Sequence, residues 1–321
     1  MVFLPNDDKA EAEARAVVAE VCAREGVKLV GWRAVPVAPE VVGRFAKATQ
    51  PRFAQVVIEG KAGQTGDALE KQLFVVRKLI EGAKGGRLGA AAPDFYFCSL
   101  SCRTIIYKGM LRSVVVGQFY KDLVNPLFES AFAIYHRRFS TNTTPKWPLA
   151  QPFRILGHNG ASCRRCRRRC CRCAAAVCRC RRRRPALGRR SDAQPTRPVS
   201  PSSKLCLTLS HSLHPTTLSN PPPKTLSKPR QTAGEINTLQ GNLNWVASRE
   251  HTLEHPTWGG REEELTPLCN AAESDSANLD HVAEILVRTG FGPEESLMLL
   301  VPEAYRNHPD LMKEYPEARV F

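Results

Sequence analysis

The sequence lacks the features of membrane insertion and of organelle or secretory targeting. No apolar run approaches the roughly 18 residues that a membrane-spanning helix needs. The opening residues, MVFLPNDDKAEAEARA, have neither the apolar centre of a signal peptide nor the Arg/Ser-rich, acid-poor composition of a transit peptide. They read like the middle of a domain. We therefore expect an intracellular protein without a membrane partner. Its compartment stays open between the cytoplasm and a plastid.

Acidic and aromatic residues are almost missing from one segment, residues 161–234. It contains 18 Lys and Arg but a single acid, Asp192, and no Phe, Tyr or Trp. The remaining chain carries 28 bases and 30 acids, so the net charge of +15 belongs to this segment alone. With so little apolar surface to bury, and a Ser/Thr/Pro-rich second half, the segment is predicted to be disordered.

The same segment concentrates cysteine, with eight of the twelve in the chain. A zinc site is one interpretation, because Cys163 and Cys166 have the spacing of a zinc knuckle. The crowded, arginine-interleaved ligands and the lack of apolar residues argue against it. A basic arm that binds nucleic acid is a second interpretation, but no aromatic residue interrupts the arginines, and we expect no nucleic-acid partner. A third is an insertion without function.

Outside this segment the sequence reads as mixed α and β. Acids at Asp7 and Asp8 followed by apolar residues at helical spacing predict a helix over 10–24 that ends at Gly26. A second helix is predicted over 65–86. A third helix is predicted to run to Arg288, with Ser276 or Asn278 as its N-terminal cap. Strands are predicted at 28–38 and 53–60, and strands or a hairpin at 94–111. Residues 128–142 are predicted to be a buried strand that runs into a polar loop.

The flanks of the segment join into one motif when 161–234 is deleted. They then read RRFSTNTTPKWPLAQPFRILGHNG/EINTLQGNLNWVASRE. This strongly resembles the glutamine amidotransferase domain of glutamate synthases, a class II, N-terminal-nucleophile family. Further agreeing blocks are MVFLP, GWRAVPV, SLSCRTIIYKGML, FYKDLVNPLFESAFA, SDSANLD and LMLLVPEAYRNHPDL.

The resemblance implies an α+β Ntn-hydrolase fold, a four-layer αββα sandwich. Residues 1–160 and 235–321 would form one amidotransferase domain, interrupted by 161–234. Because Gly160 and Gly234 flank the break where the family has one glycine, a retained intron is our hypothesis for the insertion. Its excision would remove 74 codons, or 222 nucleotides, and keep the reading frame.

The resemblance also implies the site. Asn159 and Gly160 match the oxyanion hole, where donors stabilise the developing negative charge. Arg138 matches the arginine that binds the glutamine α-carboxylate, a task suited to a guanidinium. Asp275 matches the carboxylate that receives the α-ammonium. His158 would support the loop, and two further residues, Thr141 and Asn142, would orient substrate or backbone.

In this family an N-terminal cysteine attacks the glutamine carboxamide, and ammonia leaves from a thioester. Met1 aligns with an internal family segment, so we expect the nucleophile to be absent and the fragment to be inactive as written. No metal or cofactor is expected in it. The parent enzyme would carry FMN and an iron–sulfur cluster in a missing synthase domain, which makes glutamate from 2-oxoglutarate. Alternatives are another class II amidotransferase, or a basic nucleic-acid-binding protein on a degenerate scaffold.

Overall fold

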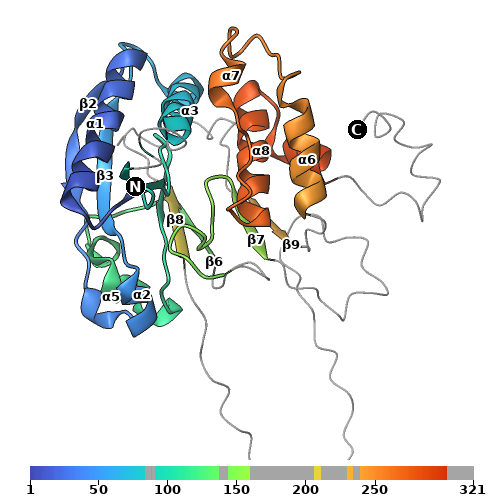
Figure 1. Cartoon of the computed structure of the whole chain (residues 1–321). Helices are drawn as coiled ribbons and strands as arrows, with labels where there is room; N and C mark the ends of the chain where they lie inside the picture. Colours follow the sequence, from blue (N-terminus) through green and yellow to red (C-terminus); the bar gives the residue numbers. More distant parts are fainter. Residues whose placement is uncertain are drawn as a thin grey trace, which may run out of the picture.

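The structure is a computed structural model in which helices and strands alternate around several small sheets (Figure 1). The N-terminal strands and helices form one group, and helices α6, α7 and α8 form a second group beside helix α3. The structure describes residues 1–83, 88, 91–136, 144–159, 206–210, 230–233 and 239–301.

A four-stranded antiparallel sheet, in the order β2-β3-β1-β4, forms the centre of the N-terminal group. All three residues of β1 are buried, so both faces of the sheet are covered. Because side chains alternate along a strand, Val2 and Leu4 lie on one face and Phe3 on the other. The strands are β1 Val2–Leu4, β2 Lys28–Ala34, β3 Arg52–Glu59 and β4 Tyr96–Phe97.

Helices α1 (Asp8–Glu25) and α3 (Gly66–Ala83) supply the apolar layer over the first face. The Asp7 carboxylate caps α1 by accepting a bond of 2.8 Å from the Ala10 amide. Gly26 ends the helix in the left-handed conformation (φ 67°), which glycine adopts without steric cost. Helix α1 confirms the helix predicted at 10–24. Asp7 is its N-terminal cap, and Asp8 lies in its first turn.

The opposite face of the sheet packs on an aromatic cluster. The rings of Phe3 and Phe53 meet edge to face with centroids 5.3 Å apart, and Trp147 lies 5.4 Å from Phe53. Strand β5 (Thr104–Tyr107) adds Tyr107 to this cluster. Of the strands or hairpin predicted at 94–111, the strands are confirmed and the hairpin is wrong, because β4 joins the four-stranded sheet whereas β5 belongs to another.

Two smaller sheets contain the remaining strands. In the first, with order β5-β8-β6, both outer strands run antiparallel to β8; in the second, β7 and β9 are parallel. Strands β8 and β9 are the nine described residues of the predicted insertion, so disorder of the whole segment stays a prediction. The strands are β6 Phe132–His136, β7 Leu156–Asn159, β8 Cys206–Ser210 and β9 Arg230–Ala233.

The second group of helices packs on α3 through Phe74, whose ring lies 5.5 Å from that of Trp258. Helix α8 is capped by Ser274, whose side chain accepts from the Ala277 amide at 3.2 Å. The predicted caps at Ser276 and Asn278 are therefore wrong, because the helix begins before both. The helices are α6 Leu239–Glu250, α7 Glu262–Leu265, α8 Asp275–Thr289 and α9 Pro293–Leu300.

Short helical turns complete the described part of the chain, which is a mixture of helices and sheets as predicted. None of its helices is both long and apolar enough to cross a bilayer. The short elements are η1 Pro39–Val41, α2 Arg44–Ala48, η2 Ser113–Val115, α5 Val116–Phe119 and η3 Lys121–Val124.

Candidate functional site

The described part of the predicted site consists of two segments that are far apart in sequence, β7 and the start of α8. Strand β7 ends at Asn159, and α8 begins at Asp275. The other predicted site residues, Arg138, Thr141, Asn142 and Gly160, lie outside the described residues. Cys163 and Cys166, with the spacing of a zinc knuckle, also lie outside them.

The first turn of α8 fixes the Asp275 carboxylate. Its Oδ1 atom accepts from the Ser276 amide at 2.6 Å and from the Ser276 hydroxyl at 3.1 Å. Asp275 is half-buried, whereas Ser276 is fully buried. A negative charge at a helix N-terminus is also favoured by the helix dipole. Asp275 therefore stays accessible while its orientation is held from the protein side.

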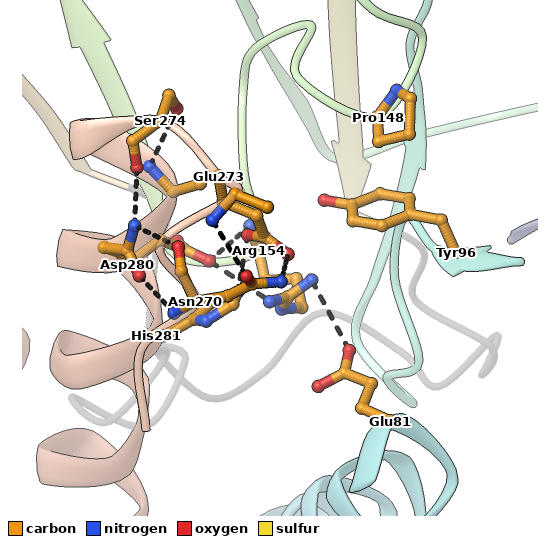
Figure 2. Close-up of polar contacts among 12 residues, drawn as sticks. Glu81, Tyr96, Pro148, Arg154, Asn270, Glu273, Ser274, Asp280 and His281 are labelled. Atoms are coloured by element: carbon orange, nitrogen blue, oxygen red, sulfur yellow. Dashed lines mark hydrogen bonds and ion pairs between the residues drawn. The ribbon is translucent and has the colours of Figure 1, made fainter. Parts of the chain in front are cut away.

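A network of amide hydrogen bonds holds the loop before α8. The buried Asn278 side chain donates to the carbonyls of Asn270 and Ser274 at 2.9 and 3.0 Å, and its oxygen accepts from the Asn270 amide at 2.7 Å. In the same loop, the Oε2 atom of Glu273 lies 3.4 Å from the Nε2 atom of His281 on α8 (Figure 2). Because both ends of the loop are bonded to α8, Asp275 is part of a rigid corner.

The backbone amides of the residues that lead into β7 are bonded to α8 by a single carboxylate. Asp280 Oδ1 accepts from the amides of Ile155 and Leu156 at 2.8 Å each, and Oδ2 accepts from the Arg154 amide at 3.2 Å. Asp280 is completely buried. Burial raises the pKa of Asp280, and the Arg154 guanidinium and the backbone amides oppose this by favouring the ionised form. This carboxylate joins the two described site segments.

Beneath this contact lies a buried ion network that reaches helix α3. The Arg154 Nε atom donates to Glu284 Oε2 at 3.1 Å, and Arg77 donates to the same carboxylate oxygen. Arg77 is also paired with Glu81 at 2.6 Å (Figure 2 shows Glu81 and Arg154). Burial opposes ionisation of Glu284, but the surrounding arginines outweigh it and lower its pKa. The network ties α3, α8 and the approach to β7 together.

Sequence reasoning missed this network, although a signal was present. In α3 the apolar positions Leu73, Val76 and Ile80 recur at helical spacing, and Arg77 falls on the same buried face. In α8, Asp280 and Glu284 are likewise one turn apart on the buried side. Charged residues on an apolar helix face must be paired to be tolerated in a core.

Four cysteines outside the predicted insertion, Cys22, Cys98, Cys102 and Cys269, offer no activated thiol. Burial raises the pKa of Cys22, Cys98 and Cys269 to about 11 each, and that of Cys102 to about 12. A nucleophilic cysteine needs a lowered pKa, because the thiolate is the reactive form. Within the described ranges, no three His, Cys, Asp or Glu side chains lie together where they could hold a metal ion.

The sequence matches a known protein family over most of its length. The family "Glutamine amidotransferases class-II" matches residues 1–163 and 202–321, and the unmatched residues 164–201 lie within the predicted insertion.

Three relatives illustrate the similarity. The ferredoxin-dependent glutamate synthase of rice (Oryza sativa subsp. japonica), named chloroplastic, is 44% identical over 317 residues, 99% of this chain. Ferredoxin-dependent glutamate synthase 2 of Synechocystis is 42% identical over 322 residues, 100% of the chain. The large chain of the NADPH glutamate synthase of Azospirillum brasilense is 34% identical over 305 residues, 94% of the chain.

Each of these matches spans only 15% of the relative's own length. The chain therefore corresponds to a small part of each of these relatives. The residues that the family match covers contain both β7 and the start of α8. The match extends over most of the chain, and so this protein belongs to the class II glutamine amidotransferases.

Proposed function

We propose that the chain is the glutamine-hydrolysing part of a glutamate synthase. One observation carries the proposal: the Asp280 carboxylate bonds the segment that leads to Asn159 onto the helix that begins with Asp275. Asn159 and Asp275 are 116 positions apart in the chain, and a glutamine site needs both of these segments. Their proximity is what a shared substrate site requires.

In the proposed site the α-amino-acid end and the amide end of glutamine are bound by different groups. Asp275 receives the α-ammonium, Arg138 binds the α-carboxylate, and the neighbouring Thr141 and Asn142 orient the substrate. Asn159 and the Gly160 amide donate to the oxygen of the carboxamide as it gains negative charge. Removing one such donor typically costs about 3–4 kcal/mol of transition-state stabilisation.

The nucleophile is proposed to be an N-terminal cysteine that is none of Cys22, Cys98, Cys102 and Cys269. Their raised pKa values support this, because each stays a neutral thiol at neutral pH. The chain by itself is then inactive. The four-layer αββα sandwich of the family is proposed as the complete fold of the domain.

The released ammonia is proposed to combine with 2-oxoglutarate, with reduction to glutamate, in another part of a longer polypeptide. The FMN and the iron–sulfur cluster of that reaction would supply electrons there. The metal-ligand groupings needed for a cluster are not found among the described residues of this chain. The names of the rice and spinach relatives include "chloroplastic", which supports a plastid as the proposed compartment, with the cytoplasm as the alternative.

Residues 161–234 are proposed to be a retained intron. The register of the β7–β9 pair supports this, because Asn159 lies beside Ala233 in a parallel ladder. Strands in such a ladder are about 4.8 Å apart, so the two ends of the segment lie close enough to be joined. Sequencing the transcript across the junction tests it: the idea fails if the major species contains the 222 nucleotides that encode this segment.

The activity is tested by extending the chain at its N-terminus with a segment that begins with the proposed cysteine nucleophile and measuring glutamate release from glutamine. We expect activity in the extended chain without 161–234, and loss of activity when the segment is present. Asp275→Asn should raise KM about 10-fold or more, because a charged hydrogen bond is worth about 1.5–3 kcal/mol. Glu262→Gln, an acid in the first turn of α7, is the control and should change nothing. Absence of glutaminase activity in the extended chain without 161–234 would refute the proposal.

A further inference from the structure

Asp280 is an unusual residue for the middle of a helix. It is completely buried on α8, and its carboxylate bonds to the backbone of another segment. Both oxygens are used, with two amides on Oδ1 and one on Oδ2. A carboxylate is suited to this because it is an acceptor only, and three successive N–H groups present donors only.

The three amides belong to the residues immediately before the candidate oxyanion strand. Leu156 is the first residue of β7 and Asn159 is the last. A strand rises about 3.3 Å per residue, so the fixed amide of Leu156 is about 10 Å from Asn159 along a short, extended path. Few soft dihedral angles separate the two. A shift at 154–156 is therefore transmitted to Asn159.

On the helix side, Asp280 is equally close to the proposed ammonium-binding carboxylate. It follows Asp275 by five residues, which corresponds to about 7.5 Å along the axis at 1.5 Å per residue. Asp275 and Asp280 are thus parts of one rigid helix, whose loop and cap are held by Asn278 and Ser274.

The side chain of Arg154 is held by several contacts of its own, which also fix the backbone beside Asp280. Its Nε atom lies 3.7 Å from Asp280 Oδ2 and 3.1 Å from Glu284 Oε2, and its Nη1 atom donates to the Phe97 carbonyl at 3.2 Å. Helix α8 and strand β4 thus hold the same guanidinium (Figure 2 shows Arg154 beside α8). The amide of Arg154 cannot move away from Asp280 without breaking these contacts as well.

We propose that Asp280 is a positioning residue for glutamine hydrolysis, setting the distance between the oxyanion strand β7 and the ammonium-binding carboxylate Asp275. It touches neither substrate nor nucleophile and acts through the backbone of 154–156. The inference rests on the proposed function. It adds to it a residue that the resemblance did not single out.

Asp280→Asn is the decisive change because it preserves size. The amide has one acceptor oxygen, which serves Ile155 and Leu156, whereas its NH₂ group then faces the Arg154 amide, donor against donor. Asp122→Asn is the matched control. Asp122 is a buried carboxylate that accepts from Arg33 at 2.5 and 2.8 Å, with no bond to β7 or α8.

Hydrogen–deuterium exchange on the full 321-residue chain measures the positioning directly. In Asp280→Asn we expect peptides covering 154–159 to exchange at least 10-fold faster, with protection of β1 to β3 unchanged. Asp122→Asn should leave 154–159 unchanged. Equal exchange of 154–159 in Asp280→Asn and the unaltered chain would overturn the inference.

Kinetics on the cysteine-extended chain without 161–234 separates positioning from general destabilisation. Asp280→Asn should lower kcat at least 10-fold with KM changed less than about 3-fold, because the oxyanion donors act in the transition state. Asp280→Glu keeps the charge but displaces it by one methylene. It should lower kcat less than Asp280→Asn does, and it provides the readout if the asparagine variant does not fold.

The two proposals fail in different ways. An unchanged kcat in both Asp280 variants, or an equal fall in Asp122→Asn, overturns the positioning role while glutaminase activity stands. If the extended chain hydrolyses no glutamine before any substitution, the proposed function itself is overturned, and the positioning role with it.

Discussion

Replacing Glu284 by glutamine removes a negative charge that accepts hydrogen bonds from two buried arginines and lies near a third, Arg288. Glu284 is 3% exposed, and its carboxylate accepts from Arg77 and, at 3.1 Å, from Arg154. Glutamine retains the shape and one acceptor oxygen. What is lost is the charge that offsets the desolvation of both guanidinium groups.

The expected destabilisation follows from what each arginine keeps. Breaking a buried ion pair costs about 3–5 kcal/mol when the partner charge stays buried. Arg77 keeps Glu81 at 2.6 Å, and Arg154 keeps Asp280 at 3.7 Å, so the lower end of that range applies. A loss of about 3 kcal/mol is a large share of a typical unfolding free energy of about 5–15 kcal/mol.

The loss should also depend on pH. Burial opposes ionisation of Glu284, but Arg77, Arg154 and Arg288 lower its pKa in the folded state. A carboxylate whose folded pKa is depressed contributes stability above its unfolded pKa, about 4.3, and loses it as pH falls through the folded pKa. The difference between the unaltered chain and Glu284→Gln is therefore greatest near pH 7 and shrinks in acid below about pH 4.

Urea unfolding followed by circular dichroism at pH 7 and at low pH measures both effects. The matched control is Glu264→Gln, an acid with a 40% exposed side chain, paired with Arg24 at 3.0 Å and Arg261 at 2.7 Å. Exposed pairs contribute about 0–1 kcal/mol, so this change should be small. Equal losses in the two variants, or a loss for Glu284→Gln that is the same at both pH values, would refute the reasoning.

Other packing and titration features lead to further expectations. Gly109→Ala should cost about 1–3 kcal/mol in chemical unfolding, since its Cβ would lie 2.3 Å from the Trp147 ring; an unchanged midpoint would contradict the close approach. Burial raises the pKa of Cys98 to about 11, so iodoacetamide at pH 7 should label it, by peptide mass spectrometry, only after denaturation. Rapid labelling of the native chain would disprove this. Tyr107→Phe removes a hydroxyl that donates to Asp122 at 2.8 Å and should lower stability by about 1–2 kcal/mol in thermal unfolding. A rise in stability would count against that bond.

The sequence predicted those helices whose ends are set by neighbouring residues. Helix α1 followed from Asp7 and Gly26 because a cap and a left-handed stop are formed by neighbouring residues. The start of α8 was predicted too late, since several Ser, Asp and Asn residues in a row are all acceptable caps. Only the bond from Ser274 to the Ala277 amide decides among them.

Long-range pairing explains most of what the sequence did not predict. Strands β4 and β5 are close in the chain but belong to different sheets, and no local pattern distinguishes that from a hairpin. Likewise, Asp275 could be named as a site residue by resemblance, whereas Asp280 could not. Its role arises from amides 124–126 residues away.

Strand β8 has a consequence for the proposed splicing. It lies between β5 and β6, and both of these strands run antiparallel to it. A transcript without this segment leaves two parallel backbone edges facing a gap one strand wide, about 9.6 Å across. Such a gap recruits any extended segment, because backbone groups rather than side chains make the pairing. In a spliced protein these two edges would be open to another strand of the polypeptide or to a strand of a neighbouring copy. In the structure, β8 fills this place and pairs with both edges.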